Sequence, residues 1–360
     1  MSRLTAGLSA ELPLSIAAHL TAPAARPRTV PLWTAAAQAQ NPDASRRWFK
    51  RLKFFIRAWM HRRYTRAWLA RLVQPDLAPL WLLRPRLAAK LQRPYVCCAW
   101  DVPVRCAALL GHYDQLPRLF APEVRAAIYR DGLTALRLVN PVSRQDLDLG
   151  FFYHDRFEKE GELTLAVRDA ASGLMLAGLT FSLVRNGNER LAIIGGLQAA
   201  NDPATRGLIH AAAKALHGFR PKALALWCLQ QLVPVWSLTQ IQAVGDAQHV
   251  WRHWRKRRKF AASYDEFWGE SDGCRQPGGN WVLPLQAQPR SREALKPNRR
   301  RQHERRYALL AALQPQLRAA VTGLATGGAG PGRKIPEFVL PDSSETERPA
   351  AAPAPLHHSY

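Results

Sequence analysis

Apolar and polar residues along the middle of the chain follow the short periods that predict a β-sheet. The segments LTALRLVN (133–140), GELTLAVRD (161–169) and LMLAGLTFSLV (174–184) read as strands, and the last two are joined by a turn at Ser172-Gly173. A turn at NGNE (186–189) leads to another strand, RLAIIGGLQ (190–198). YVCCAW (95–100) is a shorter β-prone run.

Helical segments stand before and after these strands. VRCAALLGHYDQL (104–116) and PKALALWCLQQLV (221–233) read as helices, and PATRGLIHAAAKALHG (203–218) has Pro203 near its start and Gly218 at its end. A buried strand IQAV (241–244), a helix DAQHVWRHWRKRRKF (246–260) and a strand NWVLPL (280–285) follow. This order predicts an α+β (mixed α/β) fold, in which one central mixed sheet with helical cover spans residues 150–285 and follows an N-terminal helical region.

A basic segment at 46–72, RRWFKRLKFFIRAWMHRRYTRAWLARL, carries ten Lys or Arg and no acid. Its apolar residues recur at helical spacing and form one face: Trp48, Leu52, Phe55, Ile56 and Trp59. Two interpretations stay open. The helix lies on an anionic membrane surface, or it buries the same stripe against its own domain.

Composition adds a strong positive charge to this picture. The 360 residues include 51 Lys or Arg against 27 acids, a formal net charge of +24. We therefore expect an anionic partner, namely a phosphate group, an anionic lipid or a nucleic acid, with a basic surface that binds nothing as the alternative. The predicted organisation is a disordered segment at 1–45, a basic helical region at 46–95, the mixed domain at 96–322 and a disordered tail at 323–360.

Cysteine usage and hydropathy bear on the cellular compartment. The five cysteines show no zinc-ligand spacing, so we expect buried free thiols and no metal site: Cys97, Cys98, Cys106, Cys228 and Cys274. No stretch reads as a transmembrane helix or a signal peptide. The expected location is the cytoplasm, with peripheral contact to the inner membrane as an extension of the same prediction.

Candidate chemical residues are few. Glu160 and Glu162 precede a strand and could supply a general base, although acids in such turns are usually exposed. His217, Arg220 and Lys222 fall on one connection between two helices, where they form either an anion-binding corner or a helix end with solvated charges.

Two further patterns have a structural and a functional interpretation each. Gly195 and Gly196 close a strand, where they indicate either a β-bulge with close backbone packing or a phosphate-binding backbone. Arg299, Arg300 and Arg301 open a predicted helix, either as a solvated end of the domain or as an arm that contacts phosphates.

Several local strings together resemble the VirK/YbjX family of bacterial proteins: EGELTL, LTFSL, IIGGLQ, KALHGFRPK, IQAVGDAQHV, YDEFW, WVLP and ALKPNRRRQHERRYALL. The resemblance runs from about residue 60 to about residue 315. It implies a stress protein of the cytoplasm or envelope, linked to virulence and to resistance against cationic antimicrobial peptides. Two positions depart from the family pattern, since Ala199 follows Gln198 and KPNRRR replaces a lysine-rich run.

The strand, helix, strand and helix between residues 190 and 260 also resemble the second half of the Gcn5-related N-acetyltransferase fold. That resemblance implies acyl-CoA in a gap between two parting strands, bound by Gly195, Gly196, Gln198, Arg220 and Lys222. The phosphate-binding loop of that fold, Gln/Arg-x-x-Gly-x-Gly/Ala, is not matched.

The same resemblance makes the basic block after residue 250 the outer face of a packed helix. Trp251 and Trp254 would then be buried, and Arg255, Arg257 and Arg258 exposed.

Two functions therefore remain. The first is an acyltransferase-like enzyme of envelope remodelling or peptide resistance, with Glu160, Glu162 and His217 as candidate catalytic residues. The second is a non-enzymatic basic module that binds nucleic acid or anionic lipid. An open gap beside Gln198 favours the first function, and a filled gap favours the second.

Overall fold

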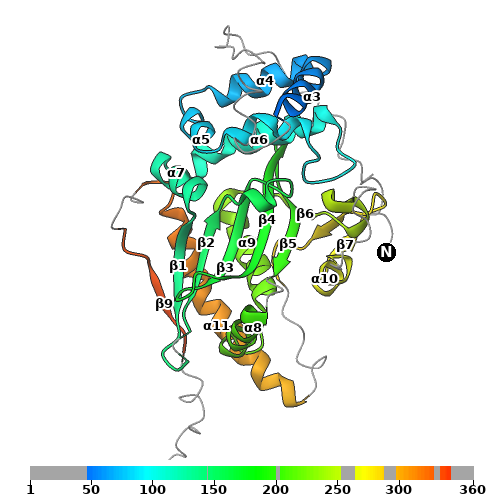
Figure 1. The fold of residues 1–360 in the computed structure, drawn as a ribbon. Coiled ribbons are helices and arrows are strands. Elements are labelled where there is room, and N and C mark those ends of the chain that lie inside the picture. The colour runs from blue at the N-terminus through cyan, green and yellow to red at the C-terminus, as the bar shows by residue number, and fades with distance from the viewer. Residues whose placement is uncertain are drawn as a thin grey trace, which may run out of the picture.

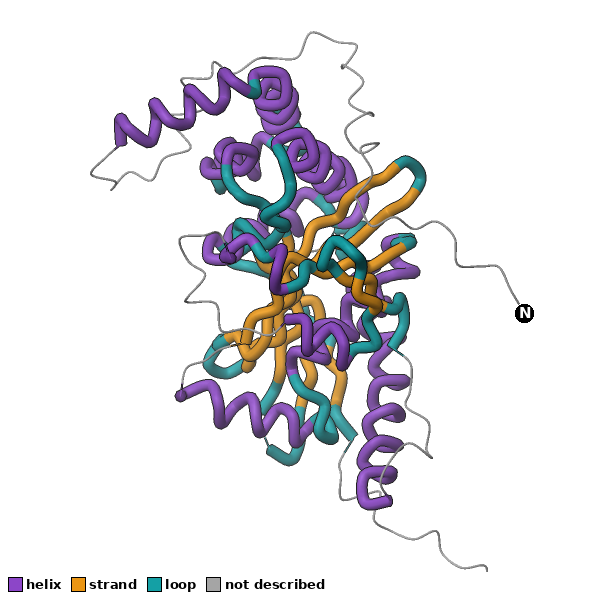
Figure 2. The backbone as a smooth tube through the Cα atoms, turned by 90° about the vertical axis from the view of Figure 1, so that its right-hand side faces the viewer, coloured by secondary structure: helices purple, strands orange, loops and turns teal. Residues whose placement is uncertain are grey.

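The computed structural model describes residues 47–143, 145–199, 203–252, 264–287, 297–327 and 333–341. Apolar side chains from Phe54 to Leu340 join in one core. A group of N-terminal helices caps one end of a central sheet, and two long helices, α9 and α11, lie along the sheet (Figure 1). Figure 2 shows the N-terminal helices at one end of the molecule, beyond the strands.

The sheet has nine strands in the order β7-β8-β6-β5-β4-β3-β2-β1-β9. Neighbouring strands pair antiparallel, except that β5 pairs parallel with β6 and β1 pairs parallel with β9. The strands are β1 (Leu133–Val139), β2 (Leu147–Phe152), β3 (Leu163–Asp169), β4 (Met175–Asn186), β5 (Glu189–Ala199), β6 (Gln240–Ala243), β7 (Cys274–Arg275), β8 (Trp281–Leu283) and β9 (Glu337–Val339).

The local sequence explains where several of the helices begin. Proline opens several of them, as expected where the first N–H needs no partner. The α-helices are α3 (Arg47–Met60), α4 (Arg62–Leu72), α5 (Ala78–Leu83), α6 (Val102–Leu119), α7 (Pro122–Arg130), α8 (Pro203–Ala215), α9 (Pro221–Trp236), α10 (Tyr264–Glu270) and α11 (Pro297–Thr322). The 3₁₀ turns are η1 (Pro85–Gln92), η2 (Asp155–Phe157), η3 (Asp246–Gln248) and η4 (Val250–Arg252).

The two faces of the sheet differ because side chains alternate along each strand. On one face, the Ser182 hydroxyl bonds to Tyr95 from the N-terminal helical layer at 2.7 Å. On the other face, Phe181 and Phe151 pack against Trp236 of α9, with ring centroids 6.1 and 5.7 Å apart. The N-terminal part of the chain, which includes Tyr95, therefore contacts the polar face of the central strands, and α9 packs on the apolar face.

The predicted α+β class, the single sheet over 150–285 and the principal strands and helices are confirmed. Three expectations are wrong. YVCCAW forms only isolated bridges, because Cys97 pairs with single residues on two sides. Residues 246–252 form two 3₁₀ turns in place of an α-helix. The tail contributes β9, whose backbone pairs with the otherwise open edge of β1.

From Arg47 onward, the basic segment forms two helices, α3 and α4, that meet at His61. Its predicted stripe does not face the core. Phe54 and Ala58 are buried, whereas Leu52, Ile56 and Trp59 are exposed. The interpretation that this stripe is buried on its own domain is therefore wrong for these three residues.

Three of the five free cysteines, Cys97, Cys106 and Cys228, are buried as expected, but Cys98 and Cys274 are exposed. No helix in the described ranges combines the length and the apolar character that a membrane crossing requires.

Candidate functional site

The parallel strands β5 and β6 part in the middle of the sheet. Their register runs from Leu191 opposite Gln240 to Ile194 opposite Ala243, and β5 then continues to Ala199 paired with β4 but no longer with β6. Figure 1 shows β6 and the elements after it turning away from β5. Parting parallel strands are the feature that the acetyltransferase resemblance led us to expect.

Gly195 and Gly196 stand where the strands part. Thr180 pairs with Gly196 while Phe181 pairs with Ile194, so Gly195 is the extra residue of a β-bulge. A Cβ on Gly195 would overlap the carbonyl oxygen of Glu160, and one on Gly196 would overlap its carboxylate. The interpretation as a bulge with close packing is confirmed, and the two glycines make room for the Glu160 segment.

Glu160 is 1% exposed, contrary to the expectation of a solvated turn carboxylate. Its Oε1 accepts a hydrogen bond from Trp251 Nε1 at 2.7 Å, and Gln198 Nε2 donates to both carboxylate oxygens at 3.2 Å. Burial raises the pKa of Glu160 to about 7, since these hydrogen bonds and the charge of Arg156 offset only part of the desolvation. The carboxyl group can therefore exchange a proton near neutral pH.

His249 and Tyr264 occupy the space beside β5 after β6 has turned away. The pKa of His249 falls to about 4 through burial, against a hydrogen bond to the backbone of Gly195 that favours the charged ring. Tyr264 accepts a hydrogen bond from Gln198 Nε2 at 2.9 Å, and burial raises its pKa. The His249 ring lies 5.0 Å from that of Tyr264, and its Nε2 lies 3.8 Å from Glu160 Oε1. Because His249 stays neutral, this approach is not an ion pair.

Asp246 and Asp265 join the residues that follow β6 to the start of α10. The backbone N–H of Tyr264 donates to Asp246 at 2.8 Å, and the N–H of Asp246 donates to Asp265 at 3.0 Å. Asp265 also accepts from Trp281 Nε1 at 2.9 Å, which links α10 to β8. Trp251 is half-buried, in partial agreement with its prediction, and Trp254, Arg255, Arg257 and Arg258 lie outside the described residues.

Sequence reasoning missed His249, Trp251 and Tyr264 as partners of Glu160. They come from short elements far along the chain, with Trp251 in η4 and Tyr264 at the start of α10, so no spacing links them to Glu160. The available signal was the Gly-Gly pair itself, since two glycines on one strand leave room for a neighbouring segment with a charged residue to approach closely.

Glu162 is also buried at 1% exposure, so the expectation of exposure is wrong here as well. Its Oε1 lies 2.5 Å from Lys90 Nζ in η1, and its Oε2 accepts from the Tyr113 hydroxyl of α6 at 2.6 Å. Tyr129 extends this chain with a 3.2 Å bond to Tyr113. These contacts join the N-terminal helices to the sheet, which points to a structural role for Glu162.

His217, Arg220 and Lys222 lie at the connection between α8 and α9, as predicted from Gly218 and Pro221. Gly218 has a φ of +76°, the left-handed conformation that suits glycine after a helix. Arg306 of α11 donates to the His217 carbonyl at 2.9 and 3.1 Å.

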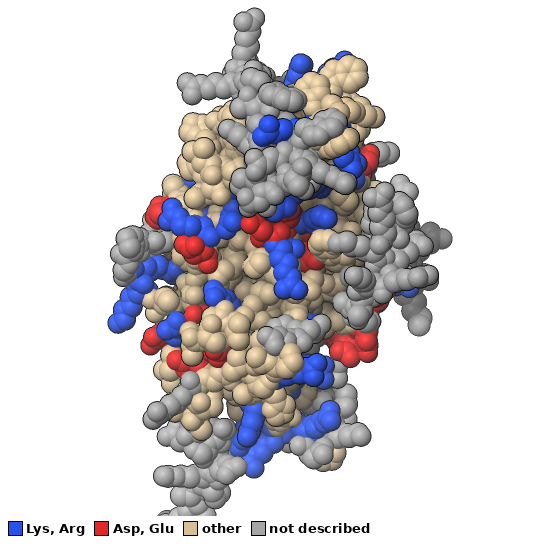
Figure 3. Space-filling model, viewed as in Figure 1, with Lys and Arg blue, Asp and Glu red and all other residues tan. Residues whose placement is uncertain are grey.

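Burial and neighbouring cations lower the pKa values of His217 and Lys222, so this corner has a positive potential. Figure 3 shows Lys and Arg over α8 and the start of α11.

The structure thus brings Gly195, Gly196, Gln198 and Glu160 together, and places His217, Arg220 and Lys222 at a separate corner. The binding of acyl-CoA by these residues stays a prediction. His249 and Tyr264 are both buried and lie against β5, at Gly195 and Leu197, beyond the point where β6 parts from it. The described residues contain no group of three His, Cys, Asp or Glu side chains suited to a metal ion.

These features define an α+β protein with a buried, titratable carboxylate at the centre of a mixed sheet. The family described as "Protein of unknown function (DUF535)" matches residues 43–319, and the chain belongs to this family.

Two relatives are similar over different lengths. "Uncharacterized protein YbjX" of Escherichia coli strain K12 is 30% identical over 279 residues, which cover 76% of this chain and 84% of the relative. An "Uncharacterized protein" of Haemophilus influenzae is 29% identical over 118 residues, 33% of this chain and 40% of the relative. The predicted VirK/YbjX membership is confirmed. No solved structure matches the chain.

Proposed function

We propose that the protein is a binding module for anionic, phosphate-bearing partners. One observation carries the proposal: α3 and α4 form a cation-rich surface without acids. Residues 47–72 contain nine Lys or Arg and no Asp or Glu. Among the described residues, the ion pairs of these two helices are those of Arg71 with Asp76 and Asp114. The remaining positive charge is available to an external anion.

The filled gap beside Gln198 supports binding over acyl transfer. His249 and Tyr264 use the space that an acyl chain would need, and each contacts the backbone of β5, at Gly195 and Leu197 respectively. Binding to anionic lipid is also consistent with the envelope association that the family resemblance implies.

A charge-matched pair of variants tests the proposal. The first replaces four exposed cations of α3 and α4 by Gln, at Lys53, Arg62, Arg63 and Arg66. The control replaces four exposed cations elsewhere, at Arg118, Arg130, Arg185 and Lys334, and so changes net charge equally.

Binding to anionic vesicles and to a DNA duplex is measured against salt concentration. Since each cation near an anionic surface contributes about 1 kcal/mol, we expect the first variant to lose at least about tenfold in affinity at low salt, and the control to lose little. Equal losses of affinity in the two variants would show that binding depends on net charge alone. That result would contradict a specific binding surface on α3 and α4.

Acyl transfer is the second candidate, and the buried Glu160 favours it. A carboxylate with a pKa of about 7 is suited to accept the proton of an attacking amine or hydroxyl. The acyl group would pass to the attacking amine or hydroxyl as the C–S bond of an acyl-CoA thioester breaks, and the CoA sulfur would take up a proton and leave as the thiol. His249 and Tyr264 would have to leave the gap.

Native mass spectrometry of freshly purified protein tests this candidate. Bound CoA in the wild type, together with loss of acyl transfer in Glu160→Gln, would support it. Protein free of CoA that shows no acyl transfer would remove it.

A further inference from the structure

Large apolar side chains are concentrated on the outside of α3. The described part of the chain has nine exposed large hydrophobic residues, and five of them lie on this helix: Phe49, Leu52, Ile56, Trp59 and Met60. Their exposed fractions range from 41% at Leu52 to 64% at Met60. Exposed apolar side chains are usually scattered singly, so a cluster of five on one helix indicates a binding surface.

The cluster lies on the face of α3 that points away from the protein. Phe54 and Ala58, at 5% and 0% exposure, fix the inner face. With about 100° of rotation per residue, Leu52, Ile56 and Met60 fall on the opposite side of the helix. The fold therefore buries Phe54 and Ala58 of α3 and leaves the larger apolar face outside. Packing of the core does not explain this face.

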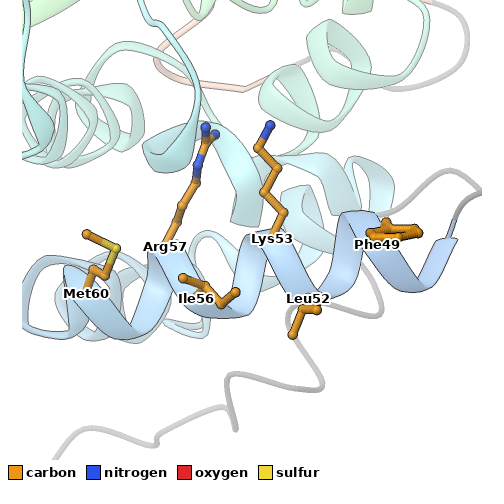
Figure 4. A pocket seen from close by; sticks show the side chains of 6 residues that line it. All are labelled: Phe49, Leu52, Lys53, Ile56, Arg57 and Met60. Atoms are coloured by element: carbon orange, nitrogen blue, oxygen red, sulfur yellow. The ribbon is translucent and has the colours of Figure 1, made fainter.

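Cations border the apolar face. Figure 4 shows Lys53 and Arg57 extending on one side of α3, while Leu52 points the other way and Ile56 lies between them. Lys53 is exposed, and Arg57 Nη1 donates to the carbonyl oxygen of Gln92 at 3.1 Å. An apolar face beside a cationic border is the arrangement of helices that lie in the interface of an anionic bilayer.

We propose that α3 inserts its outer face into the surface of an anionic phospholipid bilayer. This inference rests on the proposed function, for which it names the partner. Leu52, Ile56, Trp59 and Met60 would lie among the acyl chains near the headgroups, and the basic residues of α3 and α4 would contact the phosphates.

Charge and composition favour a bilayer over other partners. A second copy of the chain would bring two cationic, acid-free surfaces together, which is unfavourable. A nucleic acid would use the cations but would leave Leu52, Ile56 and Met60 in water. A bilayer accommodates both kinds of side chain.

The length and the charge of α3 exclude a crossing of the membrane by this helix. Its 14 residues span about 21 Å, less than the roughly 30 Å of a hydrocarbon core, and five of them are Lys or Arg. The helix would lie parallel to the membrane plane.

Vesicle flotation tests the insertion with apolar variants. The test variant is Leu52→Ser, Ile56→Ser and Met60→Ser, in which all three replaced side chains are exposed. The control variant is Val142→Ser, Leu174→Ser and Val339→Ser, which removes three exposed apolar side chains from other parts of the sheet region. Each full-length protein is mixed with phosphatidylcholine vesicles that contain or lack phosphatidylglycerol, and circular dichroism checks the fold.

We expect the wild type and the control to float with the phosphatidylglycerol vesicles and not with pure phosphatidylcholine. The test variant should bind at least about tenfold more weakly. If it floats like the wild type while the four-Gln variant of α3 and α4 does not, binding is electrostatic only, so the proposed function stands and insertion is wrong.

Other outcomes also separate the two proposals. A wild type that binds DNA but no vesicle overturns insertion alone, and a wild type that binds neither overturns both. Analytical ultracentrifugation covers the remaining occupant, because a dimer that the test variant converts to a monomer would assign the face to a second copy.

Discussion

The centre of the sheet and the outer face of α3 reverse the usual distribution of side chains. Glu160 and Glu162 are buried in the centre, whereas Leu52, Ile56 and Trp59 are exposed on α3. The buried acids accept hydrogen bonds from neighbouring side chains, because a charge without such partners is costly inside a protein. The packing of the core does not require the exposed apolar residues of α3. The difference agrees with a structural role for the buried centre and with our proposal that α3 contacts a bilayer.

The Lys90–Glu162 pair gives the largest expected effect. Glu162→Gln leaves the Lys90 ammonium buried without its counter-charge, which should lower the free energy of unfolding by about 3–5 kcal/mol. Urea denaturation measures the change. The double variant Lys90→Met with Glu162→Gln should recover part of the loss, since it removes the uncompensated charge. A single variant as stable as the wild type would show that the pair does not hold the two layers together.

Glu160 should give the next largest effect, and its sign depends on pH. The folded pKa of about 7 lies above the ordinary 4.5, so the folded state holds the proton more strongly. Glu160 therefore contributes stability at low pH that is lost as pH rises from about 4.5 through about 7. We expect Glu160→Gln to exceed the wild type by less than about 1 kcal/mol near pH 5 and by about 3 kcal/mol near pH 8.

His249 also contributes to the pH dependence of the unfolding free energy of the wild type. Its folded pKa of about 4 lies below the ordinary 6.5, so its contribution rises with pH over that interval and opposes that of Glu160. The difference in unfolding free energy between the wild type and Glu160→Gln removes this term. A difference that stays constant from pH 5 to pH 8 would contradict the raised pKa of Glu160.

The glycine pair offers a smaller and purely steric comparison. Gly195→Ala would drive a methyl group into the Glu160 backbone and should cost about 1–3 kcal/mol. Gly207→Ala is the control, because its Cβ would meet nothing within 4 Å and the position is helical. The control should stabilise the protein by about 0.5–1 kcal/mol. Thermal denaturation of both variants, with shifts of opposite sign expected, tests whether the bulge exists to accommodate Glu160.

On α3 the smallest effect on stability is expected. Leu52→Ser, Ile56→Ser and Met60→Ser together should change the free energy of unfolding by less than about 1 kcal/mol, since surface substitutions are usually near neutral. The same variant should lose vesicle binding. A large loss of stability in urea would mean that this face packs against the protein, and would end the contrast with the sheet centre.

Local patterns predicted much of the fold. The long strands β3, β4 and β5 and the helices α6, α8 and α9 were predicted because each carries a clear period or a proline or glycine boundary. β2 and β9 were missed for different reasons. LDLGFF is short and contains a glycine, and Glu337–Val339 stands in a Gly- and Pro-rich tail whose order depends on pairing with β1.

The candidate site was predictable only in part. Glu160, Gln198 and the glycine pair stood out by residue type, but their burial together depends on contacts across the sheet that no local pattern encodes. For α3 the sequence predicted an apolar stripe and left its direction open. Phe54 and Ala58 decide that direction through tertiary packing. Neither residue belonged to the predicted stripe.

The most direct test of the α3 surface is the environment of Trp59 on a membrane. Fluorescence of the wild type minus that of Trp59→Phe isolates this residue, and lipids brominated along their acyl chains quench tryptophans that enter the bilayer. With phosphatidylglycerol vesicles, we predict that the isolated signal shifts to the blue and is quenched. An unshifted and unquenched signal from protein that has bound the same vesicles would contradict insertion of α3.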